Sequence, residues 1–232
     1  MRARKSGTKL TSLGSGGCTS DNETNINRVP SFCWLTVMAT VPKSYISHQQ
    51  YLAQERMAKF KSQYFGGEMF AMAGGSREHN LIVANIVREL GNELKDRRCE
   101  VYASDMRVKV SKSGLYTYPD TSVVCDTPEF EDDQFDTLVN PKLLFEVLSE
   151  STESYDRGGK FRQYREIDSL KEYVMVSQDR VSVECYLRQA GDRWLLKEIQ
   201  SIEESVTFDS IQVTIPLAEL YRNISFEEPP QP

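Results

Sequence analysis

The sequence predicts a mixed α/β protein in which helices flank one central mixed β-sheet. Two apolar runs of strand length, "KLLFEVLS" and "KEYVMVS", are typical of strands that are buried on both faces of a sheet. The long segment "SREHNLIVANIVRELGNELKDRR" repeats apolar residues at helical spacing. Alternating apolar and polar residues surround a Gly-Gly pair in "AKFKSQYFGGEMFAMAGG", which is typical of a β-hairpin. Such elements pack in layers around a shared core.

Composition limits the classes of protein that need to be considered. The 232 residues suit one domain, and a hydrophobic fraction of 39% with 10% aromatic residues is enough for a packed core. No stretch approaches the roughly 18 apolar residues of a membrane span, so no membrane association is expected. The net charge of −6 argues against a polycation that coats nucleic acid. It permits a local site in which a metal ion offsets carboxylates.

The N-terminal residues differ in composition from the rest of the chain. The stretch "SGTKLTSLGSGGCTSDNETN" is rich in Ser, Thr, Gly and Asn. We therefore expect residues 1–37 to form a disordered or non-native leader, with Met38 as the natural start and residues 38–232 as a single domain. A signal peptide is a weaker alternative, because a long polar segment separates Arg2, Arg4 and Lys5 from the short apolar patch "SFCWLTVMA". Mass spectrometry of the native N-terminus distinguishes these readings.

The cysteine pattern predicts reduced thiols in a cytoplasmic protein. The chain has five cysteines, an odd number, and none of them forms a CxxC pair. The two histidines have no cysteines around them, so a structural zinc site is not expected.

The first half of the chain predicts helix, hairpin, helix and strands in that order. Ser47 is a plausible N-cap for a short helix that ends near Met57. The hairpin turns at Gly66–Gly67, and the long helix over residues 76–98 carries basic residues at its C-terminal end, where they complement the helix dipole. Strands are then expected at "CEVYAS", at "MRVKV" and from about Tyr118 onward, with a turn at "SKSG".

The second half predicts mainly strands. The acidic segment "CDTPEFEDDQFDTLVNP" is expected to be a solvated loop away from the functional site. The run "KLLFEVLS" follows, and "SYDRGGKFRQYREI" is a helix candidate that Gly158–Gly159 weakens. Further strands are expected at "KEYVMVS", "RVSVECYLR", "RWLLKEI" and "IQVTI", and a short helix at "PLAELYRN".

Two carboxylates and a lysine form the candidate site. Asp120 and Glu146 each lie in an apolar run, where an ionised carboxylate is costly to bury unless something pairs with it. If the two strands are neighbours, both side chains can share one Mg²⁺ ion, which prefers carboxylate, water and phosphate oxygens. Lys160 lies on the next helix, and Asp156, Lys160 and Tyr164 share one face of it. Structural pairing of these acids is the alternative.

Four segments carry a resemblance to a known family. In this order, "GGEMFAMAGGSREHN", "YPDTSVVC", "NPKLLFEVLSESTESYDRGGKFRQY" and "SLKEYVMVS" resemble the Uma family of the PD-(D/E)xK, or restriction-endonuclease-like, nuclease superfamily, over residues 45–222. The resemblance implies a restriction-endonuclease-like core. It matches Asp120 to the metal-binding aspartate and Glu146 to the acid of the (D/E)xK element. Leu148 stands where that element has its lysine, and the Uma pattern implies that Lys160 takes its place.

The resemblance also implies an activity, a cofactor and a partner. We expect a metal-dependent endodeoxyribonuclease that uses Mg²⁺, or Mn²⁺ as a substitute, held by Asp120 and Glu146 with Lys160 assisting the attacking water. Glu68, His79 and Tyr164 are accessory candidates: a further acid or metal ligand, a phosphate or network contact, and a hydrogen-bond donor. In the alternative readings, Glu68 is a solvated hairpin residue, His79 is a helix cap and Tyr164 serves only in packing. DNA is the expected substrate, and cutting both strands would favour a homodimer.

Two other classes remain open from the sequence. A non-catalytic nucleic-acid-binding or interaction module on the same fold is motivated by the missing lysine of the (D/E)xK element and by the acidic charge. It predicts binding without cleavage. A purely structural role for the acids predicts that Asp120→Asn and Glu146→Gln destabilise the protein, whereas emptying a metal site relieves repulsion between carboxylates.

Overall fold

The computed structural model describes residues 45–226, which lie in one compact unit. The predicted leader at residues 1–37 and the start at Met38 fall outside these residues, so the domain boundary stays a prediction. Within residues 45–226, no helix has both the length and the apolar character needed to cross a membrane.

The central element is a six-stranded mixed sheet with the strand order β11-β10-β9-β8-β6-β3. Its strands are β3 (Cys99–Ala103), β6 (Thr121–Cys125), β8 (Leu143–Leu148), β9 (Glu172–Ser177), β10 (Val183–Arg188) and β11 (Trp194–Ile199). β8 and β9 pair in parallel, and the other neighbours are antiparallel. Every residue of β8 and β9 is buried, because layers cover both faces of the sheet. The predicted mixed sheet is confirmed.

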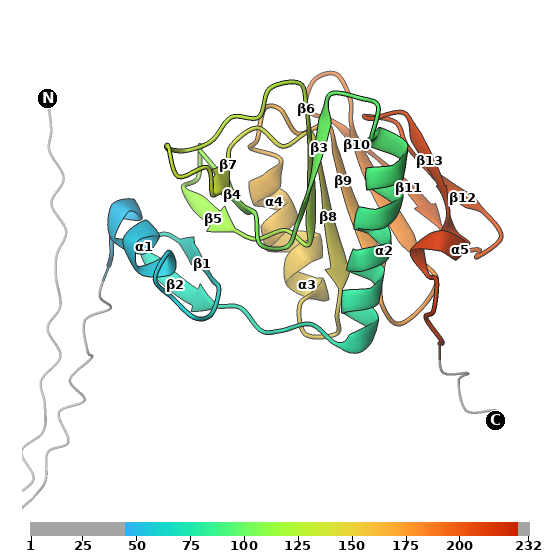
Figure 1. Cartoon of the computed structure of the whole chain (residues 1–232), viewed down its shortest axis with the longest axis horizontal. Coiled ribbons are helices and arrows are strands. Elements are labelled where there is room, and N and C mark those ends of the chain that lie inside the picture. Colours follow the sequence, from blue (N-terminus) through green and yellow to red (C-terminus); the bar gives the residue numbers. More distant parts are fainter. Residues whose placement is uncertain (1–44, 227–232) are drawn as a thin grey trace, which may run out of the picture. The chain divides into compact units, whose positions relative to one another are not determined.

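The first covering layer contains the long helix and the C-terminal elements (Figure 1). These are α2 (Arg77–Leu94), β12 (Ser205–Phe208), β13 (Val213–Pro216) and α5 (Leu217–Leu220). Ile82, Ile86 and Leu90 of α2 pack with Phe145 and Val147 of β8 in one core cluster. The apolar spacing that predicts the helix is therefore the spacing that buries it.

The second covering layer contains a separate five-stranded sheet, which the sequence analysis did not predict. Its strand order is β2-β1-β5-β4-β7. The strands are β1 (Ser62–Phe65), β2 (Glu68–Ala71), β4 (Arg107–Val110), β5 (Leu115–Thr117) and β7 (Thr137–Leu138). Val108, Leu115 and Leu138 share a core cluster with Leu144 and Tyr173 of the central sheet. The expectation of one sheet was wrong, because the chain crosses repeatedly between the two sheets from β2 to β8.

The first helix, α1 (His48–Glu55), has the predicted N-cap. Ser47 and Gln50 form a capping box, in which each side chain bonds the other residue's backbone N–H. Tyr51 of α1 stacks on Tyr64 of β1 with ring centroids 5.0 Å apart, and both are buried with Tyr116. This aromatic cluster fixes the helix to the five-stranded sheet.

The β1–β2 hairpin turns at the predicted glycines. Gly66 and Gly67 have φ values of 59° and 86°, which glycine adopts without strain. The pairing places Gln63 opposite Phe70, and Phe65 opposite Glu68. Because side chains alternate along a strand, these four share one face of the hairpin, and Tyr64 packs on the other.

The predicted helix over "SYDRGGKFRQYREI" is present without a gap from residue 153 to 164, but its π-helical middle divides it into three consecutive elements. They are α3 (Glu153–Tyr155), the π-helical turn η1 (Asp156–Lys160) and α4 (Phe161–Tyr164). π-Helical turns are rare and occur mostly within α-helices, frequently at functional sites. The Tyr155 ring lies against Gly159, where a Cβ atom would stand 2.8 Å from a ring carbon. The glycine pair therefore makes room for an aromatic ring as well as weakening the helix.

Cys99 and Cys125 form a disulfide, so the prediction of reduced thiols was wrong for this pair. The two residues lie directly opposite each other in the antiparallel pairing of β3 and β6. A spacing of 26 residues gives no sign of this pairing, because the strand register brings the cysteines together. Cys185 is a free, buried thiol. The cytoplasmic location loses the support of the cysteine argument and stays a prediction.

The acidic segment after β6 is a largely exposed loop, as predicted, but several of its acids are bound to basic side chains. Arg56 bonds both Asp132 and Asp136 at 2.7–2.9 Å. The nearly buried Arg107 reaches Asp136 at 2.9 Å, and Lys109 reaches Glu131 at 2.6 Å. Hydrogen bonds from Arg56 hold the pKa of the Asp136 carboxyl well below its usual range.

Candidate active site

Asp120 lies directly before β6, not inside a strand as the sequence analysis expected. The pairing of Thr121 with Phe145 places Asp120 beside Glu146 at one end of the central sheet. The Asp120 Oδ2 atom accepts a hydrogen bond from the Val147 backbone N–H at 2.7 Å and lies 3.2 Å from the His79 Nε2 atom. The backbone of β8 and the start of α2 thus jointly fix the position of the Asp120 carboxylate.

Glu146 is buried within β8, with 3% of its surface exposed. Its side chain belongs to the face of β8 that packs on the second layer, like Leu144 and Leu148. The Oε1 atom accepts a hydrogen bond from the Tyr164 hydroxyl at 2.8 Å. The Lys160 Nζ atom lies 2.8 Å from the same oxygen. Burial raises the pKa of the Glu146 carboxyl to about 8, and Lys160 acts in the opposite direction.

Lys160 ends the π-helical turn and is buried between two carboxylates. Its Nζ atom lies 2.8 Å from Glu146 Oε1 and 3.4 Å from Asp156 Oδ1. Burial alone would lower the pKa of the ammonium, but Glu146, Asp156 and Asp120 raise it above its ordinary value. The lysine is therefore a fixed positive charge. Sequence spacing predicted the shared face of Asp156 and Lys160, but not that Asp156 would be 3% exposed.

Tyr164, an accessory candidate, is placed in the site. Its ring is fully buried, and burial raises the pKa of its hydroxyl well above the usual value. It is therefore a neutral donor to Glu146. The neighbouring Tyr173 hydroxyl bonds the Asp156 carbonyl at 3.2 Å and so ties the π-helical turn to β9.

His79 is also placed in the site, in the first turn of α2. Its backbone N–H bonds the N-cap Ser76, and its Nε2 atom contacts Asp120. Among residues 45–226, no hydrogen-bond partner meets its buried Nδ1 atom. A Cβ atom at Gly75 would stand 2.5 Å from that nitrogen. Gly75 therefore gives the imidazole its space, a role that the sequence analysis did not identify.

Glu68, the third accessory candidate, lies in the five-stranded sheet. It begins β2, on the hairpin face that also carries Gln63. The Gln63 Nε2 atom lies 3.4 Å from the Tyr155 hydroxyl, so this face looks toward the turn that carries Lys160. A role for Glu68 as an acid or metal ligand stays a prediction.

The two carboxylates fit a hard cation such as Mg²⁺. In each of them one oxygen receives the contacts described above: Oδ2 of Asp120 and Oε1 of Glu146. The second oxygen of each group takes no part in these contacts. Residues 45–226 hold no cluster of three His, Cys, Asp or Glu side chains suited to a metal. Two carboxylates suffice for Mg²⁺, which keeps several waters and takes phosphate oxygens.

Comparison with known proteins identifies the family. The family described as "Uma2: Putative restriction endonuclease" matches residues 48–218. The chain belongs to the Uma2 family. Two relatives of this Uma2 protein, the uncharacterized proteins slr1290 and sll1609 of Synechocystis, are 35% and 34% identical to it. The matches cover 81% and 76% of this chain, and 97% and 100% of the relatives.

A solved structure shares the fold of this Uma2 protein. It is the crystal structure of a putative nuclease belonging to DUF820 from Anabaena variabilis, with a TM-score of 0.63. The match covers 76% of this chain and 97% of that chain at 15% identity, which shows the fold alone. The predicted restriction-endonuclease-like fold is confirmed. The family assignment supports a nuclease-like function.

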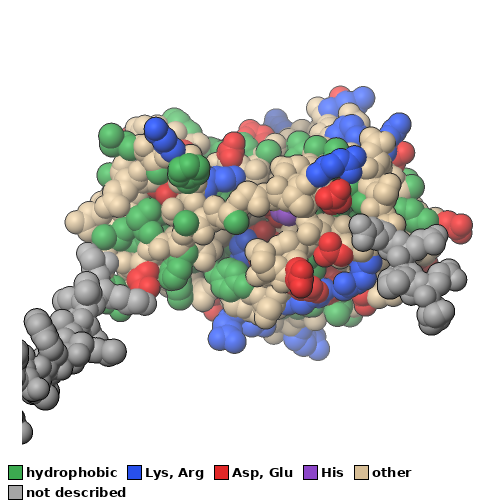
Figure 2. Space-filling model, turned by 90° about the horizontal axis from the view of Figure 1, so that it is seen from below, with side chains coloured by type: hydrophobic (Ala, Val, Ile, Leu, Met, Phe, Trp, Pro, Cys, Tyr) green, Lys and Arg blue, Asp and Glu red, His purple; other side chains and the backbone are tan. Residues whose placement is uncertain are grey.

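The lower face of the Uma2 protein is shown in Figure 2. Acidic, basic and histidine side chains meet in a hollow near the middle of that face. Hydrophobic side chains gather to the left of the hollow, over the end of the molecule that contains α1, β1 and β2.

Proposed function

We propose that this Uma2 protein is a Mg²⁺-dependent DNA endonuclease that hydrolyses phosphodiester bonds. The observation that carries the proposal is the 2.8 Å contact between the Lys160 ammonium and Glu146, made from the helix that follows β8. It supplies a cation next to Glu146 although Leu148 stands at the usual lysine position. Family membership and the shared fold support nuclease chemistry, and the metal and the DNA substrate belong to the proposal.

Asp120 and Glu146 would hold the metal through their carboxylates. A bound Mg²⁺, or Mn²⁺ in its place, lowers the pKa of a coordinated water and stabilises charge that develops on a phosphoryl group. The Tyr164 hydroxyl fixes Oε1 of Glu146, and His79 fixes Oδ2 of Asp120. Both carboxylates are thereby oriented before a substrate arrives, which avoids reorganisation during the reaction.

Lys160 acts as a donor and a fixed charge. Because neighbouring carboxylates raise the pKa of its ammonium, it stays protonated and does not serve as a base. Its hydrogens orient the attacking water and stabilise negative charge on the phosphate. Burial of the ammonium strengthens both effects, since water screens it little.

A cleavage assay tests the proposal. Wild-type protein is incubated with supercoiled, linear duplex and single-stranded DNA in Mg²⁺, in Mn²⁺ and in EDTA. We expect metal-dependent cleavage that Asp120→Ala reduces by a factor on the order of 10² or more. Asp105→Ala removes an acid whose side chain is 93% exposed, and it should cleave like wild type. Equal trace activity in wild type and Asp120→Ala would sink the proposal.

A non-catalytic nucleic-acid-binding module is the second candidate. One observation favours it: Lys160 already balances the charge of Glu146 without a metal. Calorimetric titration with Mn²⁺ separates the two candidates. The nuclease requires saturable binding that Glu146→Gln weakens, whereas the module predicts DNA binding that is indifferent to metal.

A further inference from the structure

One face of the β1–β2 hairpin presents aromatic rings. The strand register puts Gln63, Phe65, Glu68 and Phe70 on this face. Phe65 is 39% exposed and Phe70 is 43% exposed. The opposite face of the hairpin is already used, because it packs Tyr64 into the cluster with α1.

This hairpin face lies against the segment that carries Lys160. Gln63 contacts the Tyr155 hydroxyl at 3.4 Å. Phe70 lies directly opposite Gln63 on the neighbouring strand of the hairpin. Tyr155 comes directly before Asp156, and its ring packs on Gly159, the residue before Lys160. Tyr155 is 40% exposed. Two elements thus bring exposed rings to one rim of the candidate active site.

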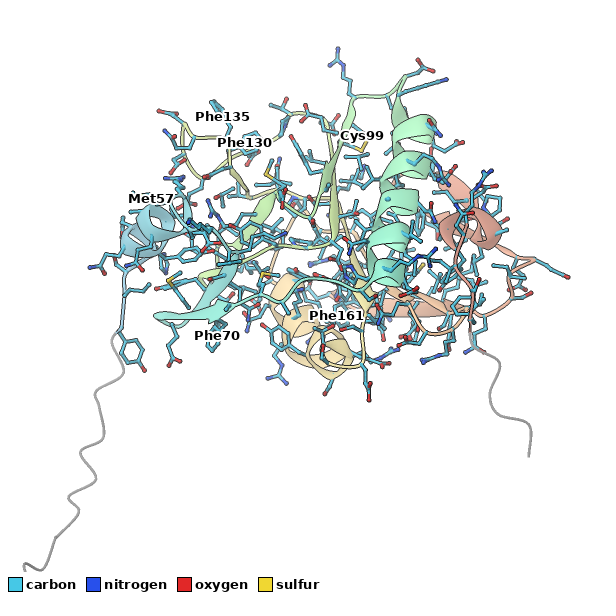
Figure 3. All side chains as sticks on the ribbon, turned by 60° about the horizontal axis from the view of Figure 1, so that its bottom comes forward. Met57, Phe70, Cys99, Phe130, Phe135 and Phe161 are labelled. Atoms are coloured by element: carbon cyan, nitrogen blue, oxygen red, sulfur yellow. A yellow bond between two sulfur atoms is a disulfide. The ribbon has the colours of Figure 1, made fainter. Side chains whose placement is uncertain are left out.

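The figures agree with this placement. Figure 3 shows Phe70 projecting from the hairpin at the lower edge of the view, on the side where α3 and α4 lie. Phe135 lies at the opposite edge of the same view. The hydrophobic side chains beside the hollow in Figure 2 lie at the same end of the molecule as the hairpin.

Charge and ring exposure together indicate the ligand. The site contains the carboxylates of Asp120, Glu146 and Asp156, and its lysine is already paired with two of them. Without a bound metal, attraction for phosphate is therefore weak here, and binding energy must come partly from another source. Exposed aromatic rings supply it by stacking on nucleobases. A base pair inside a duplex has both faces covered by its neighbours, so only unpaired bases can stack in this way.

We propose that Phe65, Phe70 and Tyr155, here called the aromatic face, bind unpaired bases of single-stranded DNA next to the phosphate to be cleaved. The substrate class is then single-stranded DNA or DNA with an unpaired segment. The proposal rests on the proposed nuclease function for the cleaved bond. Base binding itself requires no cleavage and is tested without metal.

The test is fluorescence anisotropy in EDTA with a labelled oligothymidylate strand, alone and paired with oligoadenylate. Wild-type protein should bind the single strand more tightly than the duplex. Phe65→Ala and Phe70→Ala should each weaken single-strand binding about fivefold or more, and Phe70→Trp should restore it. Phe135→Ala is the matched control: Phe135 is 63% exposed, and its loss should leave binding unchanged.

Three results would overturn the aromatic face. They are a duplex bound as tightly as the single strand, alanine variants that bind like wild type, and equal weakening by Phe135→Ala. If Phe65→Ala and Phe70→Ala change the mass in light scattering but not DNA binding, the surface contacts a second copy and the proposal is also wrong. Single-strand binding without cleavage in Mg²⁺ or Mn²⁺ would instead contradict only the proposed nuclease function.

Discussion

At the scale of single residues, the ammonium of Lys160 holds the candidate site together. It is 5% exposed and lies between Glu146 and Asp156, each 3% exposed. Tyr164 adds a neutral hydrogen bond to the same oxygen of Glu146. Lys160 is the positive charge among the groups described here that contact Glu146 and Asp156, so its removal would leave both buried carboxylates without a cation from this set. Ionised groups in such surroundings are costly, so this one side chain affects both stability and the proposed chemistry.

Replacing Lys160 by methionine tests that dependence. The variant keeps the apolar stem but leaves Glu146 buried without its cation, so the free energy of unfolding should fall by about 3 kcal/mol. Urea denaturation followed by circular dichroism measures the change. The double variant Lys160→Met with Glu146→Gln should recover part of the loss, since the unpaired charge is gone. No loss in the single variant would show that the ion pair contributes little to stability.

At the scale of elements, the π-helical turn η1 decides where the lysine lies. A continuous α-helix was expected over this segment, and the turn interrupts it between α3 and α4. Asp156 and Lys160 both lie within the turn and both point into the core. The two glycines inside it differ in surroundings: nothing lies within 4 Å of a Cβ at Gly158, whereas the Tyr155 ring meets one at Gly159.

The glycine pair provides a matched test of this element. Gly158→Ala should stabilise the protein by about 0.5–1 kcal/mol, because alanine favours helix and meets no neighbour there. Gly159→Ala should gain less or be destabilising, since its Cβ would stand 2.8 Å from a Tyr155 ring carbon. Chemical denaturation compares the two variants with wild type. Equal stabilisation by both would show that the Tyr155 ring moves aside freely.

At the scale of the whole described unit, ion pairs join segments that are distant in the sequence. Arg56 at the end of α1 bonds Asp132 and Asp136 in the acidic segment, and Arg107 of β4 reaches Asp136 as well. These contacts tie the first helix to the end of the five-stranded sheet that contains β7. They also make part of the stability depend on the ionisation of Asp136.

The pH dependence of stability follows from the sign of that shift. Arg56 lowers the folded-state pKa of Asp136 below the unfolded value of about 4, so the contribution is complete above that pH. It is lost as the pH falls toward the folded pKa. Arg56→Met should therefore flatten the fall in stability below about pH 4, measured by urea denaturation at several pH values. Arg193→Met, which removes a bond to a backbone carbonyl, should keep the wild-type slope.

Local patterns in the sequence determined most of the elements. The capping box at Ser47, the Gly66–Gly67 hairpin, helix α2 and the buried strands β8 and β9 all follow from short-range spacing, and the structure contains them. Local patterns missed β12 and the separate five-stranded sheet. Those features depend on which strands pair, and strand pairing is not encoded in the spacing of a single strand.

The sequence by itself determined which residues could form the site, and only the tertiary structure decided how they meet. Asp120 and Glu146 were identifiable because charged groups in apolar runs require partners. Lys160 was identifiable because it shares a helix face with Asp156 and Tyr164 and because the Uma pattern places the lysine there. The register of β6 and β8 and the π-helical turn place Asp120, Glu146 and Lys160 beside one another. The same kind of register pairs Cys99 with Cys125 and puts Phe65 and Phe70 on one face. The contacts of the site and of the cysteine pair join strands or turns that are distant in the chain, and packing selects such partners, whereas Phe65 and Phe70 meet through a local hairpin.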